Sequence, residues 1–103
     1  MTPGKPIGSM SEITTFKLRI SGNVQGVGYR DWAMEEAKAR GLHGWVRNRS
    51  DGTVEVLISG PDKVVQDMLG ACTMGPEAAQ VSNIDIHNEK VAPDQGFARR
   101  PTL

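Results

Sequence analysis

Residues 16–40 read FKLRISGNVQGVGYRDWAMEEAKAR, a stretch that predicts a strand, a glycine-rich loop and a helix in succession. In its first part the apolar Phe16, Leu18 and Ile20 alternate with polar residues, which is typical of a half-buried strand. From Tyr29 to Arg40 the chain has neither glycine nor proline and is rich in Ala, Glu, Lys and Arg, which indicates a helix.

Beyond this stretch the sequence predicts a hairpin and then a second helix. The hairpin joins strands at 44–48 and 54–58, since the Asp51-Gly52 pair accepts the positive φ of a tight turn. Pro61 suits the first position of the helix that follows. That helix has apolar residues at helical spacing, namely Val64, Val65, Met68, Leu69 and Cys72.

A further strand is predicted at 81–87, with Ile84 and Ile86 facing the core, and a short last strand at 97–99. The main elements follow the order β-α-β-β-α-β, which predicts an α+β fold of the ferredoxin-like type. Its sheet is expected to be mostly antiparallel, with two helices on one face, and strands joined by a helical crossover should run parallel. Many functions use this fold, so the fold by itself assigns none.

The chain has 103 residues, enough for one domain, which we expect at 13–103. Residues 1–12 are rich in Pro and Gly and are expected to lie outside the fold, as a disordered segment or a remnant of expression. Nothing in the sequence demands more than a monomer.

Charge and cysteine content argue against several function classes. Twelve basic residues balance twelve acidic ones, and a net charge of zero argues against general binding of nucleic acid. The sequence has no apolar run long enough to cross a bilayer and no secretory signal at its start, so no membrane partner is expected. Cys72 is the single cysteine and cannot form an internal disulfide. A cytoplasmic location is the expectation that remains.

The loop at 23–30 has the features of an anion-binding site. Gly26 and Gly28 permit conformations that gather successive N–H groups around one point. The helix that follows adds its free amides and the positive end of its dipole. Arg30 in the first turn opposes that dipole, and an anion in the loop would explain its position. From these residues alone, a plain turn with a solvated Arg30 fits equally well.

Two motifs resemble the signatures of the acylphosphatase family. Residues 22–30 read GNVQGVGYR and residues 44–55 read GWVRNRSDGTVE. The resemblance implies a ferredoxin-like enzyme that hydrolyses the carboxyl–phosphate bond of acyl phosphates to a carboxylate and inorganic phosphate. It assigns orientation of the attacking water to Asn48, and phosphate binding to Arg30 and to the loop residues Val24, Gln25, Gly26, Val27, Gly28 and Tyr29.

These roles imply a reaction without metal or cofactor, on a small acyl phosphate as the partner and with inorganic phosphate as the product. The leaving carboxylate is already stable, so positioning and charge stabilisation can carry catalysis. Asn48 can aim a water but is not a base at neutral pH. One cysteine and two separated histidines make no convincing metal site. Arg47 should point away from the site if Asn48 points into it, because neighbours on a strand face opposite sides.

The C-terminus departs from the family pattern. In Phe97-Ala98-Arg99-Arg100, Ala98 and Arg99 stand where the family's last strand has an apolar residue. We therefore expect that strand to be short or shifted in register, which affects the rim of the site more than its chemistry.

Three other interpretations stay open from the sequence. One is a domain of a larger maturation enzyme that handles carbamoyl phosphate, although this chain ends soon after the domain. Another is an RNA-binding module on the same fold, which needs exposed aromatic side chains on the central strands to stack bases. The third is an inactive anion-binding domain, against which the presence of both Arg30 and Asn48 argues.

Overall fold

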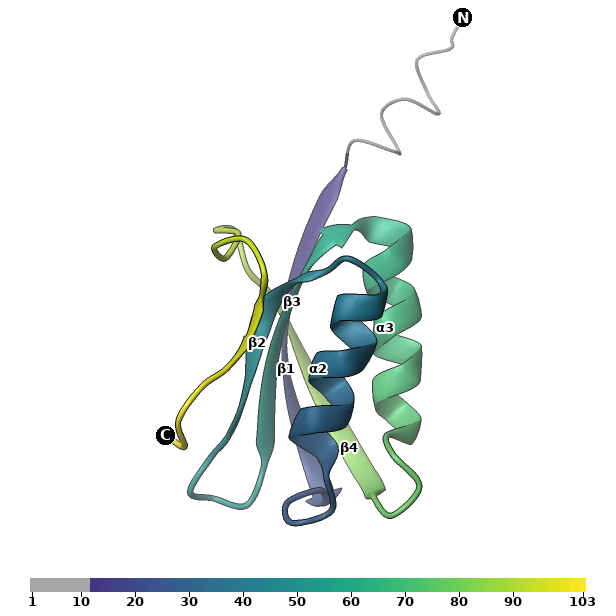
Figure 1. Ribbon diagram of the computed structural model, residues 1–103, viewed down its shortest axis with the longest axis vertical. Helices are drawn as coiled ribbons and strands as arrows, with labels where there is room; N and C mark the ends of the chain where they lie inside the picture. The colour runs from purple at the N-terminus through teal and green to yellow at the C-terminus, as the bar shows by residue number, and fades with distance from the viewer. Residues whose placement is uncertain (1–11) are drawn as a thin grey trace, which may run out of the picture.

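The computed structural model describes residues 12–103, which form two helices and five strands (Figure 1). The expectation for residues 1–12 falls outside this range, except that the Glu12 carbonyl accepts a hydrogen bond from the Asp62 amide. Neither helix in this part of the chain is long and apolar enough to span a membrane. The elements are, in chain order, β1 (Ile13–Asn23), α2 (Tyr29–Ala39), β2 (His43–Asn48), β3 (Val54–Pro61), α3 (Asp62–Met74), β4 (Gln80–Asn88) and β5 (Phe97–Arg99).

The strands form one sheet in the order β4-β1-β3-β2-β5. β1 is antiparallel to β3 and β4, β2 is antiparallel to β3, and the short β5 is parallel to β2. Both helices pack on one face of this sheet (Figure 1). This arrangement confirms the predicted α+β, ferredoxin-like fold.

Strands joined by a helix run in the same direction, as predicted, but they are not neighbours. β3 lies between β1 and β2, and β1 lies between β3 and β4. Both central strands are therefore antiparallel to their neighbours, which makes the sheet mostly antiparallel. Because β1 and β2 point the same way, their carboxyl ends lie at the same end of the sheet. The loop after β1 therefore lies close to the end of β2.

The core lies between the sheet and the two helices. Strand residues point into it alternately, as their period of two predicts, and each helix contributes residues three or four positions apart. Burial of each large apolar side chain stabilises the fold by about 1.5–3 kcal/mol. The fully buried side chains include Leu18, Ile20, Val46, Val54, Val56 and Ile58 from the sheet, Ala33 and Ala37 from α2, and Val65, Met68 and Cys72 from α3.

One detail of the sequence prediction is wrong, and another differs in its degree of burial. Pro61 is the last residue of β3 rather than the first of a helix, because pairing with Ile13 of β1 keeps it extended, with a ψ of 138°. Ile86 lies opposite Leu18 of β1, on the same face of the sheet as Ile84, but its side chain is 47% exposed. β4 is an edge strand, and Val81 and Ile84 are its residues that pack against the core.

The predicted last strand is present and short. In β5, Phe97 lies opposite Gly44 and Arg99 lies opposite Val46 of β2. The Phe97 ring is buried and needs the glycine beside it. A Cβ at Gly44 would lie 1.8 Å from the Leu57 carbonyl oxygen and 3.3 Å from that ring.

Beyond β5 the chain stays beside β2. The Arg100 amide donates to the Val46 carbonyl, and the Leu103 amide donates to the Asn48 carbonyl at 3.1 Å. The end of the chain therefore runs along β2 as far as Asn48, the last residue of that strand. This is the end of the sheet at which β1 also stops.

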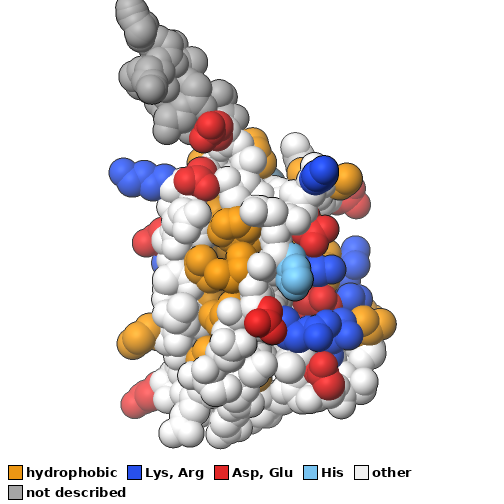
Figure 2. Space-filling view, turned by 180° about the vertical axis from the view of Figure 1, so that it is seen from behind, with side chains coloured by type: hydrophobic (Ala, Val, Ile, Leu, Met, Phe, Trp, Pro, Cys, Tyr) orange, Lys and Arg blue, Asp and Glu red, His pale blue; other side chains and the backbone are white. Residues whose placement is uncertain are grey.

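Viewed from behind, the molecule shows basic and acidic side chains interleaved beside a band of hydrophobic ones (Figure 2). Trp45 is only 9% exposed, because the guanidinium groups of Arg47 and Arg100 lie 4.6 and 4.9 Å from its ring centre. None of the five aromatic side chains, all within residues 12–103, is exposed. Within residues 12–103, the central strands therefore present no exposed aromatic side chain of the kind that the RNA-binding interpretation requires.

Candidate functional site

The loop between β1 and α2 depends on three glycines with positive φ. Gly22, Gly26 and Gly28 have φ values of 123°, 74° and 82°. At Gly22 contact also excludes a side chain, since a Cβ would lie 2.1 Å from the Gln80 carbonyl oxygen. Gly28 is the N-cap of α2 and offers no side chain to the first amides of that helix. Those amides are available to an acceptor from outside the helix, as an anion-binding loop requires.

Two buried side chains hold the ends of this loop. Val24 and Tyr29 are each 1% exposed, and the Tyr29 hydroxyl donates a 2.7 Å hydrogen bond to the Cys72 carbonyl oxygen. Burial, reinforced by the nearby Cys72, raises the pKa of Tyr29, so this hydroxyl remains a donor. Burial also raises the pKa of the Cys72 thiol to about 11. Both groups are therefore protonated at neutral pH, and the hydrogen bond from the Tyr29 hydroxyl helps to position the loop.

A small pocket of about 90 Å³ opens at this loop. A pocket of this size has room for a few water molecules or for a phosphoryl group. A larger hollow of about 670 Å³ elsewhere is lined by helical side chains such as Lys63 and Asp67 and has no such loop. The residues that line the small pocket are Val24, Gly26, Gly28, Tyr29, Arg30, Asp31, Asn48 and Arg99.

The pocket brings together Arg30 and Asn48, which come from the two separate motifs. Two of the predicted loop residues do not line it. The Gln25 side chain reaches toward the β2–β3 hairpin, and Val27 packs against the core. The roles assigned to the backbone of these two residues stay predictions.

Arg30 lies in the first turn of α2 and is half-buried. Within residues 12–103, no carboxylate oxygen comes within 4.0 Å of its guanidinium group. A cation at the positive end of a helix dipole is unfavourable by about 0.3–1 kcal/mol. Arg30 therefore contributes an uncompensated positive charge to the pocket, beside the free amides of the same helix.

Asn48 is the last residue of β2, opposite Val54 across the hairpin. Its side-chain oxygen Oδ1 is buried and has no hydrogen-bond partner in the described part of the chain. A buried acceptor without a donor costs about 1–3 kcal/mol, so this oxygen is suited to accept a hydrogen bond from a ligand or a water. The side chain of Arg47 instead binds Glu55, as the alternation along the strand predicts.

The side chain of Gln25 ties the loop to the hairpin that follows Asn48. Its nitrogen Nε2 donates to the carbonyl oxygens of Arg49 and Thr53, at 2.8 and 2.9 Å. The Arg49 amide also donates to the Thr53 carbonyl at 2.9 Å, so the same two residues close the turn. One side chain therefore sets the position of the loop relative to Asn48. This role is absent from the sequence prediction, because nothing local to Gln25 indicates its partners.

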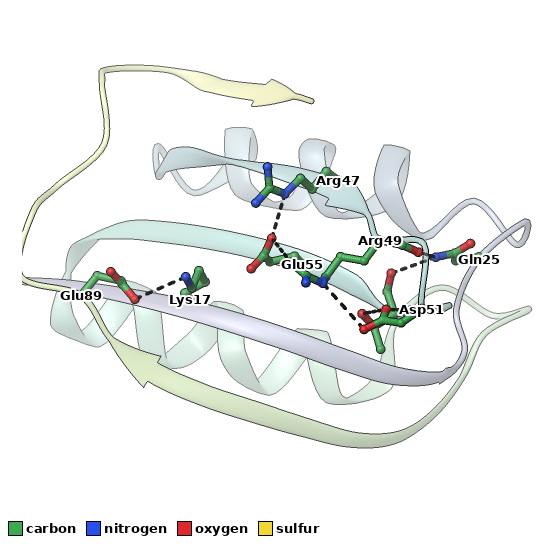
Figure 3. Close-up of polar contacts among 8 residues, drawn as sticks. Lys17, Gln25, Arg47, Arg49, Asp51, Glu55 and Glu89 are labelled. Carbon is green, nitrogen blue, oxygen red and sulfur yellow. Dashed lines mark hydrogen bonds and ion pairs between the residues drawn. The ribbon is translucent and has the colours of Figure 1, made fainter. Parts of the chain in front are cut away.

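Linked charged side chains lie on the β2–β3 hairpin itself (Figure 3). Glu55 is 3% exposed, and its Oε1 accepts hydrogen bonds from Arg47 Nε at 2.7 Å and Arg49 Nη1 at 3.3 Å. Burial alone would raise the pKa of Glu55, but the hydrogen bond from Arg47 and the two positive charges outweigh it and hold that pKa below its usual range. Glu55 is therefore ionised at neutral pH and anchors the hairpin.

Two residues that line the pocket, Asp31 and Arg99, are not predicted by the motifs. Asp31 follows Arg30 in α2, and its Oδ1 lies 2.6 Å from Arg99 Nη1. The signal in the sequence was the charged residue at position 99, where an apolar one was expected. Only the pairing of β5 with β2 brings that residue to the pocket.

A family model described as Acylphosphatase matches residues 16–99, a range that contains every residue lining the pocket. The chain belongs to the acylphosphatase family. An acylphosphatase from Rhodospirillum rubrum is 53% identical over 90 residues, which cover 86% of this chain and 98% of that protein. An acylphosphatase from Rhodopseudomonas palustris is 52% identical over 92 residues, covering 89% of this chain and 90% of that protein. By this membership the chain is a hydrolase.

Solved acylphosphatases have the same fold. The structure from Coxiella burnetii has a TM-score of 0.83 at 30% identity and covers 97% of this chain and 100% of that one. The Bacillus subtilis structure has a TM-score of 0.81 at 33% identity, covering 84% and 98%. Full-length HypF in a phosphate- and nucleotide-bound form reaches 0.81 at 22% identity, but the match covers 12% of that chain and shows the fold alone.

Proposed function

We propose that the protein hydrolyses the carboxyl–phosphate bond of acyl phosphates and releases a carboxylate and inorganic phosphate. One observation carries this proposal: a small pocket contains Arg30 at a helix N-terminus and the buried Oδ1 of Asn48, and within residues 12–103 neither the guanidinium group has an ion-pair partner nor the oxygen a hydrogen-bond donor. An anion site alone would support binding. The neutral Oδ1 of Asn48 beside that site can accept a hydrogen bond from a water molecule, which supports attack by that water on the bound group.

In the proposed mechanism, the loop and Arg30 hold the phosphoryl group. The amides at the start of α2 and the helix dipole attract the anion. The guanidinium group can bind two phosphoryl oxygens at once, which a lysine cannot. As the bond to the leaving oxygen lengthens, charge shifts among the peripheral oxygens, and these fixed donors stabilise it. The donors supply the positive potential, so the proposed reaction needs no metal.

Asn48 is proposed to orient the attacking water. Its Oδ1 accepts a hydrogen bond from that water, whose lone pair is then directed at phosphorus, in line with the leaving carboxylate. A new P–O bond forms to the water oxygen while the P–O bond to the acyl group breaks. The amide is not a base, so the water's proton passes to a phosphoryl oxygen. The leaving group departs as a carboxylate and needs no proton.

Benzoyl phosphate tests the proposed function directly. We expect the purified protein to hydrolyse it at a rate that EDTA does not change, followed by the loss of ultraviolet absorbance, with inorganic phosphate as a competitive inhibitor. Phenyl phosphate should be a far poorer substrate, because phenolate is a worse leaving group than a carboxylate and the proposed mechanism assigns no residue to protonate it. A folded sample that leaves benzoyl phosphate intact, or that EDTA inactivates, would contradict the proposal.

Replacing Gln25 with alanine should separate the loop from the hairpin. We expect kcat on benzoyl phosphate to fall about tenfold, because small misplacements of reacting groups cost up to about 10² in rate. The free energy of unfolding should fall by about 1–2 kcal/mol, for two hydrogen bonds lost. Gln66→Ala on the exposed face of α3 is the matched control and should change neither quantity measurably. Unchanged turnover in the Gln25 variant would show that the hydrogen bonds to the hairpin do not position the site.

A further inference from the structure

Arg99 places a second guanidinium group at the pocket that contains Arg30. Phe97 and Arg99 share one side of β5, and the burial of Phe97 shows that this is the side facing the core and α2. Arg100 lies on the opposite side, over Trp45. The register of a three-residue strand therefore decides which of two consecutive arginines reaches the pocket.

Arg99 lies at the mouth of the pocket, in an ion pair that is open to solvent. The Arg99 and Asp31 side chains are 44% and 67% exposed, and their Nη1 and Oδ1 atoms are 2.6 Å apart. Exposed pairs of this kind contribute about 0–1 kcal/mol. An entering anion with two negative charges can therefore compete with Asp31 for the guanidinium group.

Pocket size and charge both direct Arg99 to the phosphoryl end of the substrate. The pocket is small, so with the phosphoryl group beside Arg30 we expect the acyl group to extend out of the mouth. With Arg30 alone, a phosphoryl dianion would face one cation and the carboxylate of Asp31. With Arg99 the pocket has two cationic side chains and one carboxylate. Its net charge is then positive, which favours binding of the anion.

We propose that Arg99 is a second phosphoryl-binding residue, which exchanges Asp31 for phosphoryl oxygens when phosphate or substrate enters. The inference rests on the proposed function of this pocket and adds a ligand outside the two family motifs. Asp31 holds the long side chain of Arg99 near the pocket before the anion arrives, which lowers the conformational entropy lost on binding, but its carboxylate also competes with the anion, and we expect the competition to be the larger effect.

Titration with inorganic phosphate tests the proposal without any turnover. For Arg99→Ala we expect the dissociation constant of phosphate, measured by calorimetry, to rise about tenfold, the difference between a charge-assisted contact and an exposed ion pair. KM for benzoyl phosphate should rise similarly, with kcat changing less than about threefold. Arg100→Ala removes the same charge from the next residue, on the other side of the strand, and should shift phosphate affinity less than about twofold.

Two further measurements separate binding from a structural role. Asp31→Asn should tighten phosphate binding, because it removes the competing carboxylate, and this gain should shrink in an Asp31→Asn/Arg99→Ala double variant. The side-chain ¹⁵N resonances of Arg99 should shift on titration of the wild-type protein with phosphate. If Arg99→Ala folds poorly, Arg99→Lys keeps the charge and should show intermediate affinity.

Several results would overturn the proposal. Wild-type phosphate affinity in Arg99→Ala would show that Arg99 does not touch the anion. An effect limited to acyl phosphates with a second carboxylate on the acyl group would move Arg99 to the acyl end. If the wild-type protein fails to hydrolyse benzoyl phosphate but shows Arg99-dependent phosphate binding, the proposed function fails and this inference stands.

Discussion

Arg30→Ala is expected to lower kcat/KM for benzoyl phosphate by about 10³-fold while leaving the fold intact. Removal of one preorganised donor to a developing oxyanion costs about 10²–10³ in rate, and loss of an arginine in phosphoryl transfer costs about 10³–10⁵. Stability should move in the opposite direction. Alanine has the higher helix propensity, and removal of a cation from the start of α2 stabilises the helix by about 0.3–1 kcal/mol. The variant should therefore lose most of its activity on benzoyl phosphate while its Tm stays constant or rises slightly.

Steady-state kinetics and thermal melts on the same samples check this expectation. Lys38→Ala removes a positive charge from the exposed far end of the same helix and is the matched control. Arg30→Lys should recover little, because an ammonium group cannot bind two oxygens in one plane. A loss of less than about tenfold in the alanine variant, or an equal loss in the control, would show that Arg30 is a solvated surface residue.

Asn48→Ala is expected to lower kcat by about 10²-fold and to leave inhibition by phosphate within about twofold of the wild type. Its Oδ1 is proposed to contact the attacking water and not the phosphoryl group, so the loss falls on the transition state. A change that lowers kcat with little effect on ground-state binding has this pattern. Removal of a partnerless buried oxygen should also cost little stability, since no hydrogen bond is lost.

The control for Asn48 is Asn88→Ala, which changes the last residue of another strand at an exposed position. Asn48→Asp adds a second test, because a carboxylate at this point of an anion pocket should weaken phosphate inhibition by charge repulsion. Equal losses of kcat and of phosphate affinity in Asn48→Ala would reassign Asn48 from the water to the phosphate.

Local chemistry is what made most of the loop predictable. Gly26 and Gly28 adopt positive φ, as expected for glycines in a turn before a helix. The place of Arg30 in the first helical turn follows from the helix boundary, which the sequence predicts at Tyr29 and the structure confirms. These features depend on φ limits and on helix geometry within a few residues, so neighbours in the chain are sufficient to specify them.

Neighbouring residues could not predict three other features, which are the Gln25 hydrogen bonds, the ion pair of Arg99 and the exposure of Ile86. Gln25 Nε2 binds carbonyls 24 and 28 residues further along the chain, and Arg99 meets a carboxylate 68 residues away. The sequence pattern gives Ile86 the same alternation as Ile84, and only the position of β4 at the sheet edge exposes it.

By itself, the sequence determined the element order, the glycine turn and helix start within residues 23–30 and, through two motifs, the family. Those properties arise from alternation, turn residues and helix ends, all of which act over short stretches of chain. Only the tertiary structure decided that β1 and β2 stop at the same end of the sheet, that Gln25 ties the loop to the hairpin, and that Arg99 rather than Arg100 reaches the pocket. Strand order and register are set by packing between distant segments, where a shift of one residue would turn Arg99 to the opposite face.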